Sequence, residues 1–222
     1  MAALPISALR YRSSVLQNQT IAPGAFELEM TRGGFLYRPG DEIVIHGRSQ
    51  PEDRTYSVVS GENDPTIKLL IRIIPEGITS PLLALLKPKD TVEFTGPTGS
   101  FQLREPDRPL WFIATGTGIA PLLSFLRTHP NMRPTVLHGV RTGEELYYRD
   151  EVEQRSAAYY PCLSREGEHP QRVTDALKEL APPADADIYL CGGQPMINSV
   201  RTILLEKNIA SDRIITEPYF FW

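Results

Sequence analysis

Cysteine, histidine and positive net charge are all scarce in this chain, and each scarcity excludes a class of protein. Of the 222 residues, only two are cysteines and four are histidines. Two cysteines are too few for a disulfide framework or a thiolate-bound iron–sulfur cluster, and the scattered histidines show no metal-ligand spacing. We therefore expect no metal site. The net charge of −4 argues against nucleic-acid binding.

Long apolar runs are missing as well. No run approaches the roughly 18 residues of a membrane span, and the first residues have no apolar core of the length that a secretory signal needs. These absences predict a cytoplasmic protein. The 20 prolines and 16 glycines are spread along the chain and indicate many turns. A chain of this length forms one large domain or two domains of about 100 residues.

The two halves of the chain have different hydrophobic patterns. Up to residue 104, short runs such as "FELEM", "RTYSVVS" and "TIKLLIRII" are separated by turn residues, which predicts a small antiparallel barrel or sandwich. A short helix, "SPLLALLK", interrupts them, with Ser80 placed to cap it and Pro81 at its first position. From residue 105 on, continuous apolar runs alternate with helical segments, which indicates a parallel sheet covered by helices. The predicted domains are residues 1–104 and 105–222.

Two glycine-containing turns are candidate phosphate sites. In "ATGTGIAP" (114–121), Gly116 and Gly118 would let the backbone approach a pyrophosphate at a helix N-terminus. The sixth position is Pro121 and not glycine, so this is not the usual dinucleotide fingerprint, and a structural turn is the alternative. In "PEGITSPLL" (75–83), Gly77 and Ser80 begin the short helix, where the alternative is a simple cap.

Three further segments carry reactive or aromatic side chains. "RTYS" (54–57) places a cation, a ring and a hydroxyl together, although a solvated edge strand would look the same. In "LCGGQPM" (190–196) a cysteine ends a predicted strand, where it either touches a ligand or is a small buried apolar group. "ITEPYFFW" at the C-terminus combines one carboxylate with four aromatic residues, which should pack on something flat.

Four of these motifs occur together and follow one another along the chain in the order "RTYS", "GITS", "GTGIAP" and "CGGQPM". In them the sequence resembles the ferredoxin–NADP⁺ reductase family in its short bacterial form, over nearly the whole chain. The resemblance implies two domains: an FAD-binding antiparallel β-barrel, then an NADP-binding α/β domain whose C-terminal aromatic tail returns to the flavin.

The resemblance also implies roles for single residues at the flavin. Arg54 would pair with the flavin nucleotide's phosphate, because a guanidinium fork suits phosphate oxygens. Tyr56 would lie against the isoalloxazine ring, and Ser57 would offer its hydroxyl near flavin N5. The whole set expected to bind FAD is Arg54, Thr55, Tyr56, Ser57, Arg72, Ile73, Gly77, Ile78, Thr79, Ser80, Tyr219 and Trp222.

For the second cofactor, the resemblance implies NADP(H). Ser164 and Arg165 in "CLSRE" match the family segment that holds the 2′-phosphate, whereas an NADH enzyme more often places an acid there. Arg141 and Arg172 are candidates for a second cation. The whole expected set is Thr115, Gly116, Thr117, Gly118, Arg141, Ser164, Arg165, Arg172, Cys191, Gly192 and Met196.

The expected activity is hydride exchange with NADP(H) and single-electron exchange with ferredoxin or flavodoxin. Ser57, Cys191 and Glu217 are the expected catalytic residues: Ser57 and Glu217 position and polarise, and Cys191 fixes the nicotinamide. The acceptor must be separate, because the chain has too few cysteines for its own cluster. Such acceptors are commonly acidic, and a basic rim could receive one. The arginines considered for it are Arg10, Arg12, Arg32, Arg38 and Arg48. We expect a monomer.

Three alternative functions share most of these motifs. One is an NAD(P)H:flavin reductase acting on free flavin, against which the aromatic C-terminus and the "GITS" segment speak. Another is the reductase component of an oxygenase system, which would usually carry a fused cluster domain that this sequence does not show. A non-catalytic flavoprotein that senses redox state is the third, and it could dispense with Cys191 and Glu217.

The sequence departs from the family pattern in three places. It has "PGD" where many relatives have Pro-Gly-Gln, and Pro195 directly before Met196 where the proline often comes earlier. Three residues, "FFW", follow Tyr219. Either Tyr219 or Trp222 is therefore a candidate for the aromatic residue that covers the flavin.

Overall fold

The computed structural model describes residues 9–47, 53–104 and 108–219 and forms two domains. The first is an antiparallel sheet with strand order β4-β3-β6-β1-β2-β5. Its strands are β1 (Arg10–Ala22), β2 (Ala25–Thr31), β3 (Glu42–Ile45), β4 (Arg54–Ser57), β5 (Thr66–Arg72) and β6 (Thr91–Thr98), and helix α1 (Thr79–Ala84) lies between the last two. An antiparallel bridge between Val58 and Leu69 joins the two ends of the sheet and closes it into a barrel.

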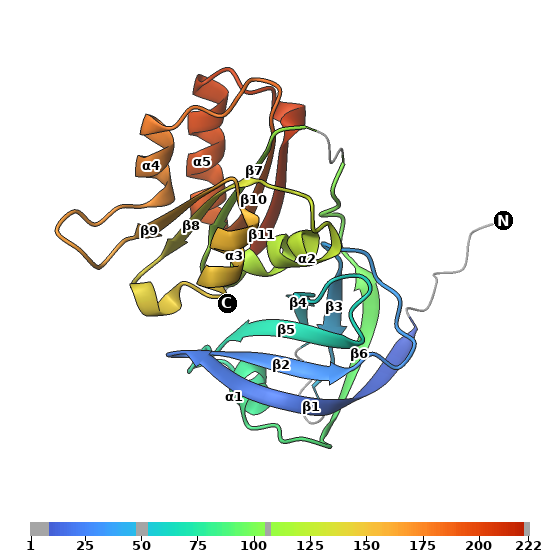
Figure 1. Ribbon diagram of the computed structural model, residues 1–222. Helices are drawn as coiled ribbons and strands as arrows, with labels where there is room; N and C mark the ends of the chain where they lie inside the picture. The colour runs from blue at the N-terminus through green and yellow to red at the C-terminus, as the bar shows by residue number, and fades with distance from the viewer. Residues whose placement is uncertain (1–8, 48–52, 105–107, 220–222) are drawn as a thin grey trace.

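The second domain is a five-stranded parallel sheet with helices on both faces (Figure 1). Its strand order is β11-β10-β7-β8-β9. The strands are β7 (Leu110–Thr115), β8 (Thr135–Val140), β9 (Ala158–Leu163), β10 (Asp187–Gly193) and β11 (Ile214–Tyr219); the helices are α2 (Ala120–Thr128), α3 (Arg149–Arg155), α4 (Val173–Glu179) and α5 (Gln194–Glu206). The predicted fold class, a barrel followed by a parallel-sheet domain, is confirmed.

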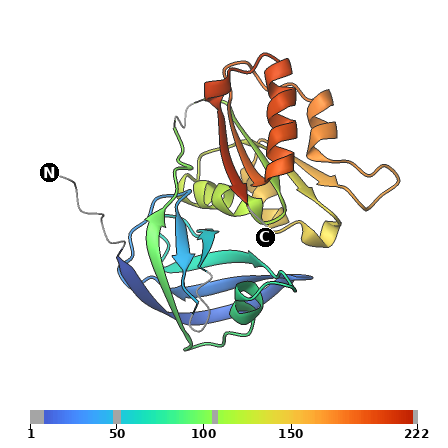
Figure 2. The same ribbon diagram turned by 180° about the vertical axis from the view of Figure 1, so that it is seen from behind.

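Strand β7 shows why its apolar run is continuous. Phe112 and Ala114 pack into one core cluster together with residues of α2. Trp111 and Ile113 point to the opposite face and pack with residues of α4 and α5, the orange and red helices that cover the sheet in Figure 2. A parallel strand buried on both faces has no polar side, so its sequence does not alternate.

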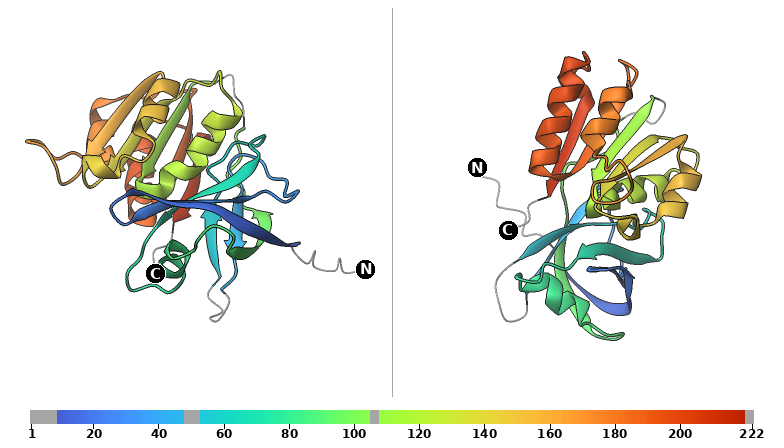
Figure 3. Two further views of the ribbon diagram at one scale, coloured as in Figure 1. Left: turned by 60° about the horizontal axis from the view of Figure 1, so that its bottom comes forward. Right: turned by 90° about the vertical axis from the view of Figure 1, so that its left-hand side faces the viewer.

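Hydrogen bonds join the two domains, whose arrangement Figure 3 shows from two further sides. The Ser124 hydroxyl on α2 donates to the carbonyl of Ser60 after β4, at 2.7 Å and out of solvent. The Tyr148 hydroxyl beside α3 donates to the Glu27 carboxylate on β2, at 2.6 Å. These direct contacts between the domains therefore fix the relative position of the walls of any cavity that lies between them.

Two strands were missed by the sequence patterns. Strand β1 is the longest of the barrel, but register shifts between Val15 and Gln17 and between Thr20 and Ala22 break its alternation. The C-terminal segment is not a loose tail up to Tyr219. It forms β11, a parallel edge strand on β10 that tolerates Pro218 because an edge strand need not donate on its outer side.

The predicted cap of the short helix was wrong. Helix α1 begins at Thr79, its N-cap position is Ile78, and no side chain caps it. Ser80 lies inside the first turn, and its hydroxyl accepts the backbone N–H of Ile74 at 2.9 Å. Ser80 therefore ties the helix back onto the loop that precedes it.

Candidate functional site

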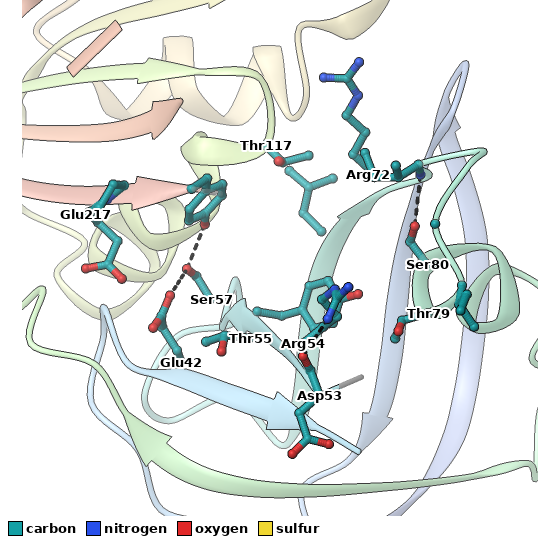
Figure 4. A pocket seen from close by; sticks show the side chains of 17 residues that line it. Glu42, Asp53, Arg54, Thr55, Ser57, Arg72, Thr79, Ser80, Thr117 and Glu217 are labelled. Atoms are coloured by element: carbon teal, nitrogen blue, oxygen red, sulfur yellow. Dashed lines mark hydrogen bonds between the residues drawn. The ribbon is translucent and has the colours of Figure 1, made fainter. Parts of the chain in front are cut away.

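A cavity of about 460 Å³ lies between the barrel and the parallel sheet (Figure 4). Strand β4 supplies one wall, the loop before α1 a second, and the end of β11 a third. The lining residues are Glu42, Asp53, Arg54, Thr55, Tyr56, Ser57, Leu70, Arg72, Ile74, Gly77, Ile78, Thr79, Ser80, Thr117, Glu217, Pro218 and Tyr219. We call this the flavin cavity, because it collects most of the residues predicted to bind FAD.

Strand β4 places its four side chains at the floor of the flavin cavity. It pairs with β3 so that Ser57 lies opposite Glu42, and it ends at Ser57. All four of its residues line the cavity. Tyr56 is half-buried, and burial raises the pKa of its hydroxyl to about 12. Its ring is therefore a neutral surface at physiological pH.

Gly77 and Ser80 form the wall opposite β4. The backbone N–H of Gly77 donates to the carbonyl of Ile74 at 2.9 Å. A Cβ at Gly77 would lie 3.2 Å from that carbonyl oxygen, which is tighter than most real contacts. A side chain at this position would require the neighbouring Ile74 to shift by a few tenths of an ångström, so the tight turn that borders the cavity favours glycine.

Ser57 connects three elements at the inner corner of the flavin cavity. Its Oγ lies 2.7 Å from the Tyr219 hydroxyl on β11 and 3.4 Å from Oε1 of Glu42 on β3. Figure 4 shows both contacts and places the Glu217 side chain beside them. The corner is therefore built from residues of both domains.

Glu217 and Glu42 interact directly at this corner. Burial raises the pKa of Glu217, and a hydrogen bond and charge repulsion from Glu42 raise it further, to about 8. Glu42 was not among the predicted site residues. The only signal for it in the sequence was its place in the "PGDE" segment, next to the departure from the family pattern.

Cys191 lies behind Tyr219. It is fully buried, and burial raises the pKa of its thiol well above the usual value. The Tyr219 hydroxyl lies close enough to this thiol for the two groups to raise each other's pKa, and it contacts Ser57 directly. Cys191 lines neither the flavin cavity nor the second cavity described next.

A second cavity, of about 500 Å³, lies along the carboxyl ends of the parallel strands. Its lining residues are Arg72, Thr115, Gly116, Thr117, Gly139, Val140, Arg141, Glu145, Cys162, Ser164, Arg165, Arg172, Val173, Thr174, Gly193, Pro195, Met196 and Ser199. We call it the dinucleotide cavity. It shares Arg72 and Thr117 with the flavin cavity, so the two are neighbours with a common wall.

The glycine turn between β7 and α2 is shaped by close packing. Gly116 has a φ of +55°, which favours glycine. A Cβ at Gly118 would lie 2.4 Å from the carbonyl oxygen of Cys191, so only glycine lets this turn pack on β10. The buried ring of His138 lies 3.0 Å from the Gly116 carbonyl, and burial lowers the pKa of this histidine to about 4, which keeps it neutral.

The candidate cations of the dinucleotide cavity differ in their partners. Arg141 forms an ion pair with Glu145, which lowers the pKa of that carboxyl. Arg165 and Arg172 line the cavity and are exposed. The Ser164 hydroxyl donates to the Val140 carbonyl at 3.1 Å. The acid Glu145, which the sequence analysis did not select, thus neutralises one of the predicted cations.

Most predicted site residues line one of the two cavities, and a few do not. Gly118 and Gly192 lie in the packing behind the glycine turn, where a Cβ at Gly192 would lie 2.1 Å from Thr115 Oγ1. Ile73 packs against the barrel core. Trp222 lies outside the described residues. Within the described ranges, no cluster of His, Cys, Asp or Glu has the arrangement of a metal site.

Several of the arginines considered for a basic rim are engaged with other groups of the barrel. Arg12 pairs with Glu93 at 2.6 Å, and Arg10 lies 3.9 Å from the same carboxylate. Arg32 donates to three backbone carbonyls, those of Phe35, Glu62 and Asp64, so its guanidinium is used in holding loops. Arg48 lies outside the described residues.

Comparisons with known proteins agree with this geometry. Residues 10–103 match the oxidoreductase FAD-binding domain and residues 112–202 match the oxidoreductase NAD-binding domain. The toluate 1,2-dioxygenase electron transfer component of Pseudomonas putida is 31% identical over 221 residues, covering 92% of this chain and 64% of that protein. The reductase component of propane 2-monooxygenase from Rhodococcus jostii is 27% identical over 242 residues, covering 99% of this chain and 65% of that protein. The chain thus spans just under two thirds of these relatives.

Solved structures share the fold over nearly the whole chain. A ferredoxin–NADP⁺ reductase from Neisseria gonorrhoeae, with bound FAD and NADP, has a TM-score of 0.87 at 22% identity and covers 96% of this chain and 100% of its own. A cytochrome P450 reductase from Amycolatopsis has a TM-score of 0.84 at 25% identity, covering 96% of this chain and 71% of its own.

The fold and the two matched domains define an electron-transfer oxidoreductase that uses FAD and a pyridine dinucleotide. The chain combines the oxidoreductase FAD-binding and NAD-binding domains and has the fold of the ferredoxin–NADP⁺ reductases. Among the described residues, no helix is both long and apolar enough to cross a membrane.

Proposed function

We propose that this protein is an FAD-dependent reductase that exchanges a hydride with NADP(H) and single electrons with a carrier protein, ferredoxin or flavodoxin. The observation that carries the proposal is the common wall of the two cavities. Arg72 and Thr117 border both, so a flavin in one and a nicotinamide in the other would meet. Hydride transfer requires the reacting atoms to come within about 3–3.5 Å.

The flavin cavity suits FAD by the chemistry of its lining. It offers the Arg54 guanidinium for a phosphate, the neutral Tyr56 ring for a flat aromatic system, and the tight turn at Gly77 for close backbone approach. Bound there, FAD would supply the chemistry that joins a two-electron donor to a one-electron acceptor. The protein's own residues bind, orient and exclude water.

Tyr219 acts as a removable cover in this proposal. Its hydroxyl bonds to Ser57 and lies near the Cys191 thiol, so the tyrosine would have to move for a nicotinamide to reach the cysteine. Displacing the ring breaks the 2.7 Å contact to Ser57 and frees that hydroxyl to orient the reacting ring. Ser57, Glu217 and Cys191 then surround the transferred hydride as predicted catalytic residues.

The dinucleotide cavity supports NADPH as the preferred partner. Arg165, Arg172 and Ser164 line one end of it, where the 2′-phosphate would lie, and Gly116 and Thr117 line the other. Because Glu145 neutralises Arg141, we assign the 2′-phosphate to Arg165 and Arg172. A charge-assisted contact of this kind contributes roughly 1.5–3 kcal/mol.

The deciding experiment is an anaerobic titration of the purified protein with NADPH and, separately, with NADH, following the visible flavin band. We expect a yellow protein with one FAD per chain that NADPH bleaches readily and NADH poorly. A colourless protein that turns over only with added free flavin would instead be a flavin reductase. Equal bleaching by both nucleotides would overturn the NADPH assignment alone.

A second candidate rests on the curated relatives, several of which are electron transfer or reductase components of oxygenases. In that case the natural acceptor is the partner of an oxygenase. Reduction rates measured in parallel for a ferredoxin, a flavodoxin and a Rieske-type oxygenase component separate the two candidates. The proposal fails if only the oxygenase component is reduced.

A further inference from the structure

A buried histidine lies behind the glycine turn of the dinucleotide cavity. His138 is on β8, and its side chain is wholly out of solvent in a strand that is otherwise apolar after its first residue. His138 lines neither cavity, whereas Gly116 of the turn lines the dinucleotide cavity. Burying a polar ring costs free energy unless its nitrogen atoms are hydrogen-bonded. The partners of this ring therefore show what the histidine holds in place.

These partners fix which nitrogen of His138 carries the proton. Nε2 lies 3.0 Å from the carbonyl oxygen of Gly116, and Nδ1 lies 3.4 Å from the hydroxyl of Tyr159 on β9. Burial lowers the pKa of His138 to about 4, so the ring is neutral near pH 7 and has a single N–H. A carbonyl oxygen can only accept, so this N–H is on Nε2 and donates to Gly116. Nδ1 then accepts from the Tyr159 hydroxyl.

The hydrogen bond from His138 turns the Gly116 carbonyl away from the dinucleotide cavity. Its acceptor is a carbonyl aimed at a buried side chain that is not part of the cavity lining. Among the described residues the only cis peptide bond is Gly96–Pro97, so the bond from Gly116 to Thr117 is trans and its N–H points opposite to its C=O. The N–H of Thr117 thus points away from His138, and Thr117 lines both cavities.

The glycine itself does not select this orientation. Gly116 has a φ of +55°, and a Cβ there would meet no atom within 4 Å, so neighbouring atoms leave the peptide room to rotate. A rotated peptide would present its carbonyl oxygen to a bound phosphate, in place of the N–H that a phosphate prefers. It would also leave the buried N–H of His138 without an acceptor, which costs free energy. The histidine therefore favours the orientation that suits a phosphate.

We propose that His138 is a positioning residue for dinucleotide binding: its Nε2–H holds the Gly116 carbonyl so that the Thr117 N–H faces the pyrophosphate of the nucleotide. Tyr159 supports the ring through Nδ1, and His138 itself touches no atom of the nucleotide. NADPH and NADH share the pyrophosphate, so His138 serves both equally, unlike Arg165. The inference rests on the proposed function, because it requires a pyridine dinucleotide in this cavity.

The state of the ring is tested by NMR without turnover. Protein labelled with ¹⁵N in its histidine rings is titrated from pH 5 to 8, and the signals of His138 are those that disappear in His138→Gln. We expect His138 to stay neutral over this range with its proton on Nε2. A proton on Nδ1, or a ring that becomes charged above pH 6, overturns the proposal.

The effect on binding is tested by calorimetry with NADPH and, separately, with NADH. His138→Phe keeps an aromatic ring but has no N–H, so both nucleotides should bind about 10-fold more weakly. His138→Gln has a side-chain N–H that reaches a position similar to that of Nε2, and it should restore most of the affinity for both. Unchanged affinities in His138→Phe, or a loss confined to NADPH, overturn the proposal.

Stopped-flow reduction of the bound flavin separates positioning from chemistry. In His138→Phe the NADPH concentration that gives half the limiting rate should rise about 10-fold, in line with the weaker binding, while the limiting rate changes less than two-fold. The reason is that His138 contacts no reacting atom. A lowered limiting rate with an unchanged half-saturating concentration contradicts the assigned role.

The matched control is Val136→Ala. Val136 lies two residues before His138 on the same face of β8 and is also fully buried, so its loss disturbs the same core. Val136→Ala should unfold at a lower denaturant concentration but bind both nucleotides as the wild type does. An equal loss of affinity in Val136→Ala would make His138 a packing residue only and overturn the proposal.

The wild type separates the failure of this inference from that of the proposed function. A wild type that binds neither NADPH nor NADH overturns both together. A wild type that binds and is reduced by these nucleotides, with normal binding in His138→Phe, overturns the role of His138 alone.

Discussion

The two cavities meet at a common wall, yet the inner corner of the flavin cavity and the lining of the dinucleotide cavity differ in charge. The inner corner of the flavin cavity holds two carboxyl groups, a hydroxyl and a phenol, and the groups that act on Glu217 include no described cation. The dinucleotide cavity is lined by four arginines and by one acid, Glu145, which is already paired. The first arrangement can hold and move a proton, and the second can attract phosphates.

The largest effect is expected at Ser57, whose hydroxyl contacts both Glu42 and Tyr219 at the inner corner of the flavin cavity. Ser57→Ala should slow flavin reduction by NADPH about 100-fold, because an orienting hydroxyl is lost, while FAD stays bound. Stopped-flow absorbance measures the rate and the flavin spectrum measures occupancy. Thr66→Ala on β5, which loses only a bond to Glu29, is the control. A normal rate in Ser57→Ala would remove Ser57 from the reaction.

The second prediction concerns the arginines of the dinucleotide cavity. Arg165→Ala should weaken NADPH binding about 10-fold or more and NADH binding less than two-fold, because only NADPH carries the 2′-phosphate. Binding is measured by calorimetry with both nucleotides. Arg133→Ala, an exposed arginine outside both cavities, should leave both affinities unchanged. Equal losses for NADPH and NADH would show that Arg165 does not read the 2′-phosphate.

The third prediction tests the glycine turn that both cavities use. Gly118→Ala should lower the free energy of unfolding by about 1–3 kcal/mol, because its Cβ would lie 2.4 Å from the Cys191 carbonyl oxygen and the turn must shift. Chemical denaturation measures the loss. In Gly193→Ala the nearest atom lies at 3.9 Å, so little change is expected. Equal effects in the two variants would mean that close packing at Gly118 is unimportant.

The last prediction concerns the pH dependence of stability. The pKa of Glu217 is raised in the folded protein to about 8, so the folded state binds more protons than the unfolded one between the ordinary glutamate pKa and pH 8. The contribution of Glu217 to the free energy of unfolding is present in full below the pKa that this glutamate has in the unfolded chain. It is lost as the pH rises through this window, by up to about 1.4 kcal/mol per pH unit. Glu217→Gln should flatten the curve of unfolding free energy against pH. A curve that rises through the window in the wild type and is unchanged in the variant would contradict the raised pKa.

The sequence predicted those parts of the site that lie within short motifs. "RTYS" forms β4 and lines the flavin cavity, and "GTG" forms the turn before α2, because both depend on strand alternation and glycine geometry over a few residues. Strand β1 escaped prediction because its register shifts break the alternation. The cap at Ser80 was wrong because the hydroxyl finds a better partner in the backbone of Ile74.

The sequence by itself determined the antiparallel first domain, the parallel sheet of the second and the resemblance to the ferredoxin–NADP⁺ reductases, since these follow from local hydrophobic periodicity and from motifs of four to six residues. Only the tertiary structure decided that Glu42 acts on the pKa of Glu217, that Glu145 neutralises Arg141, and that the Tyr219 hydroxyl bonds to Ser57. The reason is physical. The charge of a carboxyl group depends on burial and on the groups around it, and folding brings those groups together from distant parts of the chain.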